Sequence, residues 1–332
     1  MLIRWEALSF ILGQFLLALA AAMLVPVAWG IAFGGGGVSA LVGSALLTGG
    51  CGGSLLLALP RPERELKQRE ALMLVVLAWF LAAGFGALPF IWSGHFVSIT
   101  DAVFESASGM TTTGATIMND VEVLPEPIQL WRHLTHWLGG MGIVLLGLAV
   151  LPLVGHGGMS LYRAEFSGAK SEKLKPRIAE TALALYKLYV AFTLLEWVAL
   201  RLAGMSWFDA LCHALSTLGT GGYSTRNSSE GGFDSALIEW IVIVFMLVAG
   251  ISFVQHYRLF VERRPRAFFG DFELRAYLLV AFVAVVLIAP TLILFNGYDL
   301  ARAVRGATFQ VSAILTTTGF GTENFELWYP LA

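Results

Sequence analysis

Apolar runs of about 20 residues recur along this chain, and they limit what it can fold into more than any other feature. Such a run is the length of helix that crosses the hydrocarbon core of a membrane. The 332 residues are 57% hydrophobic and only 13% charged, whereas a soluble domain carries roughly 25% charged residues. We therefore expect an all-α polytopic membrane protein. Seven spanning candidates lie at about 8–32, 38–59, 71–92, 133–154, 180–203, 236–257 and 275–296.

The first apolar run has some features of a cleavable signal peptide. Arg4 precedes it, and small residues stand at 18–20, where a cleavage site would be expected. Apolar character nevertheless continues without interruption to Phe33. We therefore expect a retained first spanning helix.

Lys and Arg residues gather on one side of the membrane if the seven spans alternate. This side holds fifteen of the 21 basic residues, whereas the opposite side holds five. Basic residues are enriched in cytoplasmic loops, so the sequence predicts a multi-pass protein whose basic clusters and N-terminus lie in the cytoplasm. The fifteen are Arg4; Arg61, Arg64, Lys67 and Arg69; Arg163, Lys170, Lys173, Lys175 and Arg177; and Arg258, Arg263, Arg264, Arg266 and Arg275. The five are Arg132, Arg201, Arg226, Arg302 and Arg305.

A short cassette of hydroxyl residues and glycine occurs three times, each time after a segment too polar to span a membrane and too apolar to be a plain loop. The copies read GMTTTGATIM (109–118), TLGTGGYSTR (217–226) and ILTTTGFGTENF (314–325). An ungapped alignment of 101–116 with 209–224 and 306–321 makes Gly114, Gly222 and Gly319 coincide. The repetition predicts three equivalent re-entrant segments, all entering from the outside.

Each copy is expected to be a short helix followed by non-helical backbone. Asp101 and Asp209 open the first two copies and can cap their helices, whereas the third copy has Gly306 there and no identified cap. Non-helical backbone is tolerated at membrane depth only where it lines a watery path or is buried in protein. A plain Gly/Thr-rich loop is the alternative for any one copy, but three matching copies favour a common pathway.

The cassettes have the chemistry of a site for a monovalent cation. Backbone carbonyls in a ring can replace the water shell of potassium, and a helix C-terminus favours positive charge. Carboxylates, which suit divalent ions, are missing between the threonines and the glycine of each cassette. The pattern favours potassium over sodium.

Several longer stretches give the sequence a wider resemblance. They read ALPF (87–90), FESASGMTTTGAT (104–116), GGMGI (139–143), GGMSLYRAEFSG (157–168), KPRIAETA (175–182), GGYST (221–225) and TTTGFGT (316–322). On these the chain resembles the Trk-type potassium uptake proteins of the Trk/Ktr/HKT superfamily over essentially its whole length. That family has four helix–pore–helix repeats around one potassium pathway, preceded in the Trk branch by two extra helices.

The resemblance implies a domain organisation and a set of site residues. Two N-terminal transmembrane helices would occupy 1–60, the first repeat 61–155, the second 156–260, and an incomplete third 261–332. It implies potassium uptake, as a symporter or a channel-like protein driven by the membrane potential, with K+ as the transported ion, no covalently bound cofactor and no enzymatic activity. The filter residues it implies are Thr111, Thr112, Thr113, Gly114, Thr220, Gly221, Gly222, Thr317, Thr318 and Gly319.

The resemblance also implies partners. They are a second copy of the chain in a homodimer and a cytoplasmic, TrkA-like ring of nucleotide-binding subunits that gates transport; nucleic acid is not expected. The basic loops at 155–180 and 258–275 are either docking surfaces for that ring or ordinary positive-inside flanks. Compared with the family, the chain stops at Ala332, so we expect a truncated form that does not conduct alone.

Three features leave other readings open. His133 and His136 are three residues apart and could support a haem- or quinone-carrying redox protein, although we expect them to be surface histidines near the outer interface. Glu105 either adds negative potential near the filter or bonds to backbone behind it, and the second reading is preferred. Glu196 has no assigned role.

Overall fold

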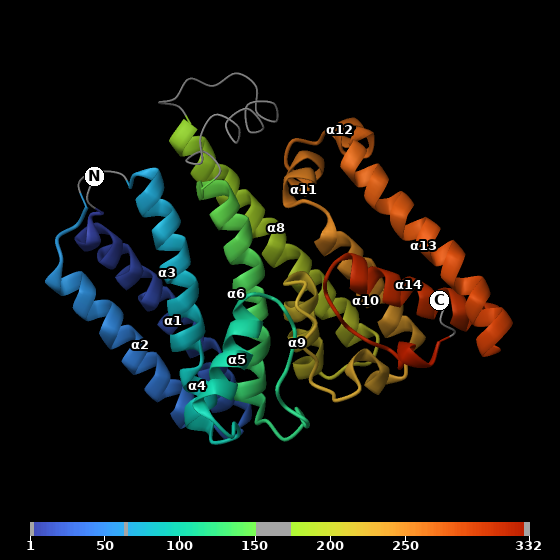
Figure 1. Cartoon of the computed structure of the whole chain (residues 1–332), viewed down its shortest axis with the longest axis horizontal. Helices are drawn as coiled ribbons and strands as arrows, with labels where there is room; N and C mark the ends of the chain where they lie inside the picture. The colour runs from blue at the N-terminus through green and yellow to red at the C-terminus, as the bar shows by residue number, and fades with distance from the viewer. Residues whose placement is uncertain (1–2, 63–65, 151–173, 329–332) are drawn as a thin grey trace. The chain divides into compact units, whose positions relative to one another are not determined.

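The computed structural model describes residues 3–62, 66–150 and 174–328, and every regular element in these ranges is helical (Figure 1). The chain forms two compact units. One comprises Met1–Thr111, Ala115–Met118 and Val123–Ala182, and the other comprises Thr112–Gly114, Asn119–Glu122 and Leu183–Ala332. The second unit thus takes two short stretches from the first cassette and the residues after it.

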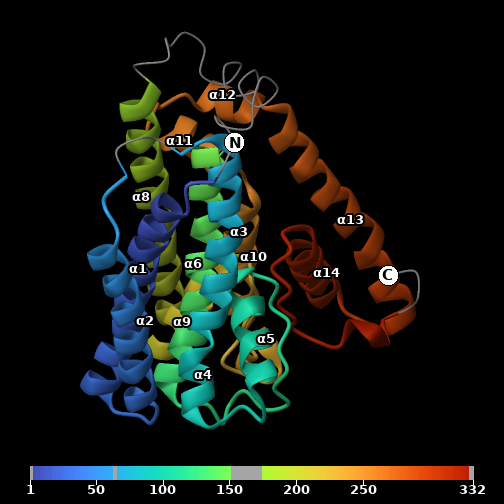
Figure 2. The ribbon, with the colours of Figure 1, turned by 60° about the vertical axis from the view of Figure 1, so that its left-hand side comes forward.

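The first unit is a bundle of long helices with one short re-entrant helix. Helices α1 and α2 lie side by side, as Figure 2 shows. Gly13 and Gly52 face each other where these two helices pack, and their backbones come close enough that a methyl group on Gly52 would lie 2.8 Å from the Gly13 carbonyl oxygen. The elements are α1 (Trp5–Phe33), α2 (Val38–Ala58), α3 (Gln68–Gly86), α4 (Leu88–Ser93), α5 (Ile99–Met110) and α6 (Glu126–Val150).

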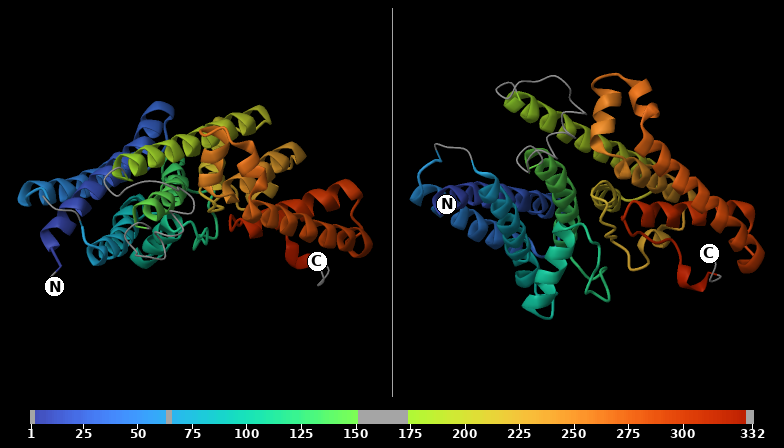
Figure 3. Two further views of the ribbon diagram at one scale, coloured as in Figure 1. Left: turned by 90° about the horizontal axis from the view of Figure 1, so that it is seen from above. Right: turned by 45° about the horizontal axis from the view of Figure 1, so that its top comes forward.

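The second unit packs around apolar side chains from α8, α10 and α14. Leu200, Met246 and Phe309 are completely buried in this core, and the long helix α13 packs along α14, as both views of Figure 3 show. Its elements are α8 (Leu174–Leu202), which begins in the first unit, α9 (Trp207–Leu218), η2 (Ser229–Phe233), α10 (Ala236–Gly250), α11 (Phe253–Phe260), α12 (Pro265–Gly270), α13 (Phe272–Asn296), α14 (Leu300–Leu315) and η3 (Phe325–Leu327).

Five described helices are long and apolar enough to cross a membrane, which confirms a multi-pass membrane protein. They are Trp5–Phe33, Val38–Ala58, Arg69–Ser93, Glu180–Leu202 and Phe272–Asn296. The expected span 236–257 is broken, because α10 and α11 meet at a bend of 96°. The expected span 133–154 belongs to α6, which already begins at Glu126, and residues 151–154 lie outside the described residues.

Some expectations concern residues that lie outside the described ranges. These are Arg64, the stretch 157–168 with Arg163, and Lys170 and Lys173. The domain boundaries at 60, 155 and 260 remain predictions.

Candidate selectivity filter

The three cassettes follow three short helices in the same register. Helices α5, α9 and α14 end at Met110, Leu218 and Leu315, each four residues before the glycine of its cassette. The alignment of the three glycines therefore also aligns the ends of three helices. The C-terminal carbonyls of each helix, which carry partial negative charge, lie directly before the cassette.

The helix starts differ from the sequence-based expectation. Ser98 and Ser206 are the N-caps of α5 and α9, and their hydroxyls accept hydrogen bonds from the amides of Asp101 and Asp209 (3.1 and 2.9 Å). The two aspartates thus lie one turn inside, where an acidic side chain still favours the helix N-terminus, and the expectation that they are caps was wrong by three residues.

The third short helix has a cap that the alignment could not reveal. Asp299 caps α14 by accepting a hydrogen bond from the Arg302 amide (3.0 Å). Helix α14 has 16 residues, whereas α5 and α9 have 12. Its cap consequently precedes Gly306 by seven residues in the sequence, outside the aligned segment.

The backbone of the cassettes repeats the same unusual conformation. Thr112, Thr220 and Thr317 have φ angles of 54°, 51° and 59°, each two residues before the cassette glycine. Left-handed backbone is uncommon for residues other than glycine and costs about 1–2 kcal/mol. Three equivalent strained residues indicate that the rest of the fold imposes this shape, as happens at functional sites.

The cassette glycines allow neighbouring copies to approach closely within the second unit. A methyl group on Gly114 would overlap the carbonyl oxygen of Gly221, and a methyl group on Gly222 would overlap that of Thr318. Gly221 and Thr318 occupy the same place, one residue before their own glycines. The same carbonyl-to-glycine contact thus joins the first copy to the second and the second to the third.

Three threonine hydroxyls of the cassettes make hydrogen bonds to other groups of the protein. Thr111 and Thr316 donate from Oγ1 to the carbonyls of Ala107 and Ser312, each 2.7 Å away. Oγ1 of Thr318 lies 2.7 Å from that of Thr316, and the Thr318 side chain is buried. The carbonyls of Ala107 and Ser312 also accept a hydrogen bond from the amide of the same threonine (2.9 and 3.0 Å), so each threonine bonds the last turn of its helix through its backbone and its side chain.

Glu105 braces the backbone that follows the first cassette. Its carboxylate accepts hydrogen bonds from Thr116 Oγ1 (3.0 Å) and the Ile117 amide (3.1 Å), and Arg132 Nε lies 2.6 Å away. Both charged side chains are buried. This supports the reading in which Glu105 bonds to backbone behind the filter.

His213 takes the equivalent place in the second copy. It aligns with Glu105, and its Nε2 lies 2.9 Å from Oγ of Ser224, which aligns with Thr116. Nδ1 lies 2.7 Å from the Asp209 carbonyl oxygen; because a carbonyl only accepts, Nδ1 carries a proton. The sequence analysis missed this role, although the alignment of the copies contained the signal for it.

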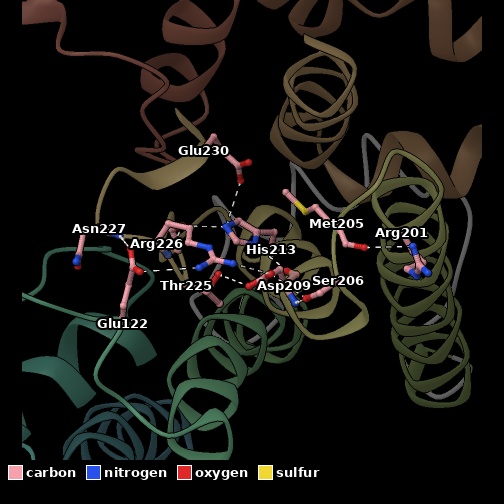
Figure 4. Close-up of polar contacts among 11 residues, drawn as sticks. Glu122, Arg201, Met205, Ser206, Asp209, His213, Thr225, Arg226, Asn227 and Glu230 are labelled. Atoms are coloured by element: carbon pink, nitrogen blue, oxygen red, sulfur yellow. Dashed lines mark hydrogen bonds and ion pairs between the residues drawn. The ribbon is translucent and has the colours of Figure 1, made fainter. Parts of the chain in front are cut away.

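Polar residues just past the second cassette form a connected cluster (Figure 4). Asp209 accepts hydrogen bonds from Thr225 Oγ1 (2.6 Å) and Arg226 Nη2 (3.2 Å). Arg226 also lies 3.9 Å from Glu122, which follows the first copy in the sequence. Asn227 extends the cluster further toward that copy, as described below. The sequence analysis counted Arg226 only as an outer basic residue.

Two histidines of α6 differ from their expected surroundings. His133 and His136 in α6 are fully buried, so the expectation that they are surface histidines was wrong. The reason is that α6 already begins at Glu126 and packs against α1, α3 and α5, so both residues lie within a packed stretch of helix. Glu196 in α8 is also fully buried, near Thr217 and Glu230.

Comparison with known proteins identifies the family. The TrkH family of cation transport proteins matches residues 46–332. The chain belongs to this family. It is 41% identical over 320 residues to the Trk system potassium uptake protein TrkH of Halomonas elongata, covering 96% of this chain and 66% of that relative. For the protein of the same name from Escherichia coli K12, identity is 38% over 328 residues, covering 98% and 68%.

A solved structure supports the same assignment. The crystal structure of the potassium transporter TrkH from Vibrio parahaemolyticus matches with a TM-score of 0.88 and 34% identity, over 97% of this chain and 67% of that one. The chain spans about two thirds of the length of these relatives. The match confirms the helical membrane fold class. Since the TrkH-family relatives are named as transport proteins, the family also favours transport over an enzymatic or redox role.

Proposed function

We propose that this TrkH-family chain contributes three filter segments to a potassium uptake protein of the bacterial inner membrane. The observation that carries the proposal is the repeated contact between a carbonyl of one cassette and the glycine of another. The proposed filter residues are Thr111, Thr112, Thr113, Gly114, Thr220, Gly221, Gly222, Thr317, Thr318 and Gly319.

The cassettes favour potassium because their oxygens are uncharged. Carbonyls brought together at the ends of three helices replace water around a monovalent ion. The relatives above are named potassium uptake proteins or a potassium transporter. In the proposed mechanism the membrane potential drives entry, and it supplies about 2.3 kcal/mol per charge for each 100 mV.

The proposal includes partners and an orientation. Arg263, Arg264 and Arg266 are exposed around the start of α12, which suits a cytoplasmic face and a docking surface for a TrkA-like ring of nucleotide-binding subunits. A homodimer and a cytoplasmic N-terminus belong to the same proposal. The basic residues near the N-terminus and around the start of α12 support this orientation through the positive-inside rule.

Rubidium uptake tests the proposed filter. The whole reading frame that contains this chain is expressed in potassium-starved cells that lack their own transporters, beside the variants Gly114→Ser, Gly222→Ser and Gly319→Ser. We expect uptake by the parent and weaker discrimination against sodium in each variant. Gly84→Ser is the control, because a methyl group there has open space around it. Uptake with the parent's selectivity in all three variants would refute this filter assignment, and no uptake by the parent would refute the proposed transport.

A further inference from the structure

The residues after the second cassette are tied to those after the first by the side chain and amide of Asn227. Its Oδ1 accepts a hydrogen bond from the Val121 amide (2.8 Å), and its Nδ2 donates to Asp120 Oδ1 (2.8 Å). Its own amide donates to Glu122 Oε1 (3.1 Å). One asparagine thus makes three hydrogen bonds to three consecutive residues that follow the first copy, all within the second unit.

The same segment continues to the third copy. Ser229 Oγ accepts a hydrogen bond from the Gly321 amide, and the Gly231 amide donates to the Gly321 carbonyl, both at 3.2 Å. A methyl group on Gly231 would overlap the carbonyl oxygen of Thr322. Residues 227–231 therefore contact the backbone just after the first cassette and the backbone past Gly319 in the third.

The segment is also fixed to its own short helix. Thr225 and Arg226 bond to Asp209 in the first turn of α9, and the guanidinium of Arg226 lies 5.6 Å from the centre of the Phe233 ring. Ser229 has a φ angle of 55°, which indicates that the backbone here is held in an unfavourable shape by its contacts. The link between copies is thus anchored where the second helix begins.

We propose that residues 225–231 form a clamp that holds the three filter segments in register, and that Asn227 is a positioning residue for potassium selectivity. The inference rests on the proposed filter. Asn227 lies five residues past Gly222 and does not belong to the cassette. It acts by fixing where the first segment lies against the second, and so the spacing of the carbonyls that surround the ion.

Because Asn227 is exposed, a substitution there can change selectivity without a large change in stability. Asn227, Asp120 and Glu122 are all exposed to solvent, and Asn227→Asp keeps the oxygen that accepts from the amide of the buried Val121, so this change leaves no buried polar group without a partner. The free energy of unfolding should fall only slightly, because an unsatisfied polar group is costly mainly when it is buried. Selectivity is different, since it depends on the distances between carbonyls.

The test uses the whole reading frame that contains this chain. Asn227→Asp removes the Nδ2 donor and places a carboxylate against Asp120 and Glu122. We expect the ratio of rubidium to sodium uptake to fall roughly tenfold, the scale of one hydrogen bond to a charged group. Asp120→Asn combined with Asn227→Asp exchanges donor and acceptor, and is expected to restore the ratio. Asn119→Ala, at an exposed neighbour, is the control and should keep it.

The outcomes separate the clamp from the filter. If Gly222→Ser lowers selectivity and Asn227→Asp does not, the clamp is refuted while the filter stands. If the parent takes up no rubidium, the proposed function itself fails. Thermal unfolding in detergent is measured for every variant. The clamp is supported if Asn227→Asp lowers selectivity, the double variant with Asp120→Asn restores it, and the melting temperature is unchanged. A loss of selectivity that persists in the double variant contradicts the clamp.

Discussion

His213 Nε2 lies 3.5 Å from Glu230 Oε1, and both side chains are completely buried behind the second cassette. Nδ1 of His213 donates to the Asp209 carbonyl, and Nε2 also lies 2.9 Å from Oγ of Ser224. Burial raises the pKa of the Glu230 carboxyl, and His213 partly offsets this. Asp209 and Glu239 raise it further, and Glu196 is another acidic neighbour.

This arrangement predicts a pH-dependent stability that Glu230→Gln removes. A carboxyl whose pKa is raised by folding contributes stability that is complete below its unfolded pKa of about 4.3. That contribution is lost as the pH rises through the folded pKa. The parent's melting temperature should therefore fall as the pH rises above about 4.3, more steeply than that of Glu230→Gln, whose amide does not titrate. Glu326→Gln changes an exposed glutamate, so its melting temperature should vary with pH as that of the parent does. If the melting temperature of Glu230→Gln also varies with pH as the parent's does, the prediction is wrong.

The packing of α1 on α2 predicts opposite effects at two adjacent glycines. A methyl group on Gly52 would lie 2.8 Å from the Gly13 carbonyl oxygen, whereas one on Gly53 would meet nothing within 4 Å. Gly52→Ala should lower the free energy of unfolding by about 1–3 kcal/mol, because the helices must separate. Gly53→Ala should be neutral or raise it by up to about 1 kcal/mol through helix propensity. Thermal unfolding of both variants in detergent checks the contrast, and similar melting temperatures would show that the two helices can shift freely.

The buried pair of Glu105 and Arg132 predicts a large loss when one charge is removed. Their closest atoms are 2.6 Å apart, and both side chains are almost fully buried. Arg132→Met leaves the Glu105 carboxylate buried without its cation, which typically costs about 3–5 kcal/mol. The double variant with Glu105→Gln should recover part of this loss. Arg264→Met, in an exposed pair with Glu262, should cost no more than about 1 kcal/mol. The amount of folded protein in the membrane and its melting temperature are the measurements, and equal losses in the two arginine variants would contradict the prediction.

The long helices and the cassettes could be predicted from the sequence because both leave local patterns. An apolar run has a length that can be compared with the membrane, and three cassettes can be aligned by their glycines. The same alignment contained the relationship between Glu105 and His213, since each faces the residue two positions past its glycine. It could not locate Asp299, because α14 is longer than the other two short helices.

Contacts between distant residues could not be predicted in this way. Asn227 bonds to residues more than 100 positions away, and no spacing in the sequence marks such a pair. The break between α10 and α11 lies at Gly250, Ile251 and Ser252, inside a run whose apolar character hides it. Burial of His133 and His136 depends on how α6 packs against α1, α3 and α5, and this packing leaves no local pattern in the sequence.

The third cassette predicts that a filter threonine can lose its hydroxyl and keep its function. Thr316 Oγ1 donates its one proton to the Ser312 carbonyl, so the bond of 2.7 Å between the two hydroxyls has Thr318 as donor. Thr318→Val removes this buried bond at a cost of about 1 kcal/mol and keeps the main-chain carbonyl that faces Gly222. The melting temperature should fall slightly, and the ratio of rubidium to sodium uptake should remain that of the parent. Gly222→Ser, which pushes against the same carbonyl, should lower the ratio. If Thr318→Val lowers it as much, the hydroxyl itself contacts the ion, and the assignment of this site to main-chain oxygens is wrong.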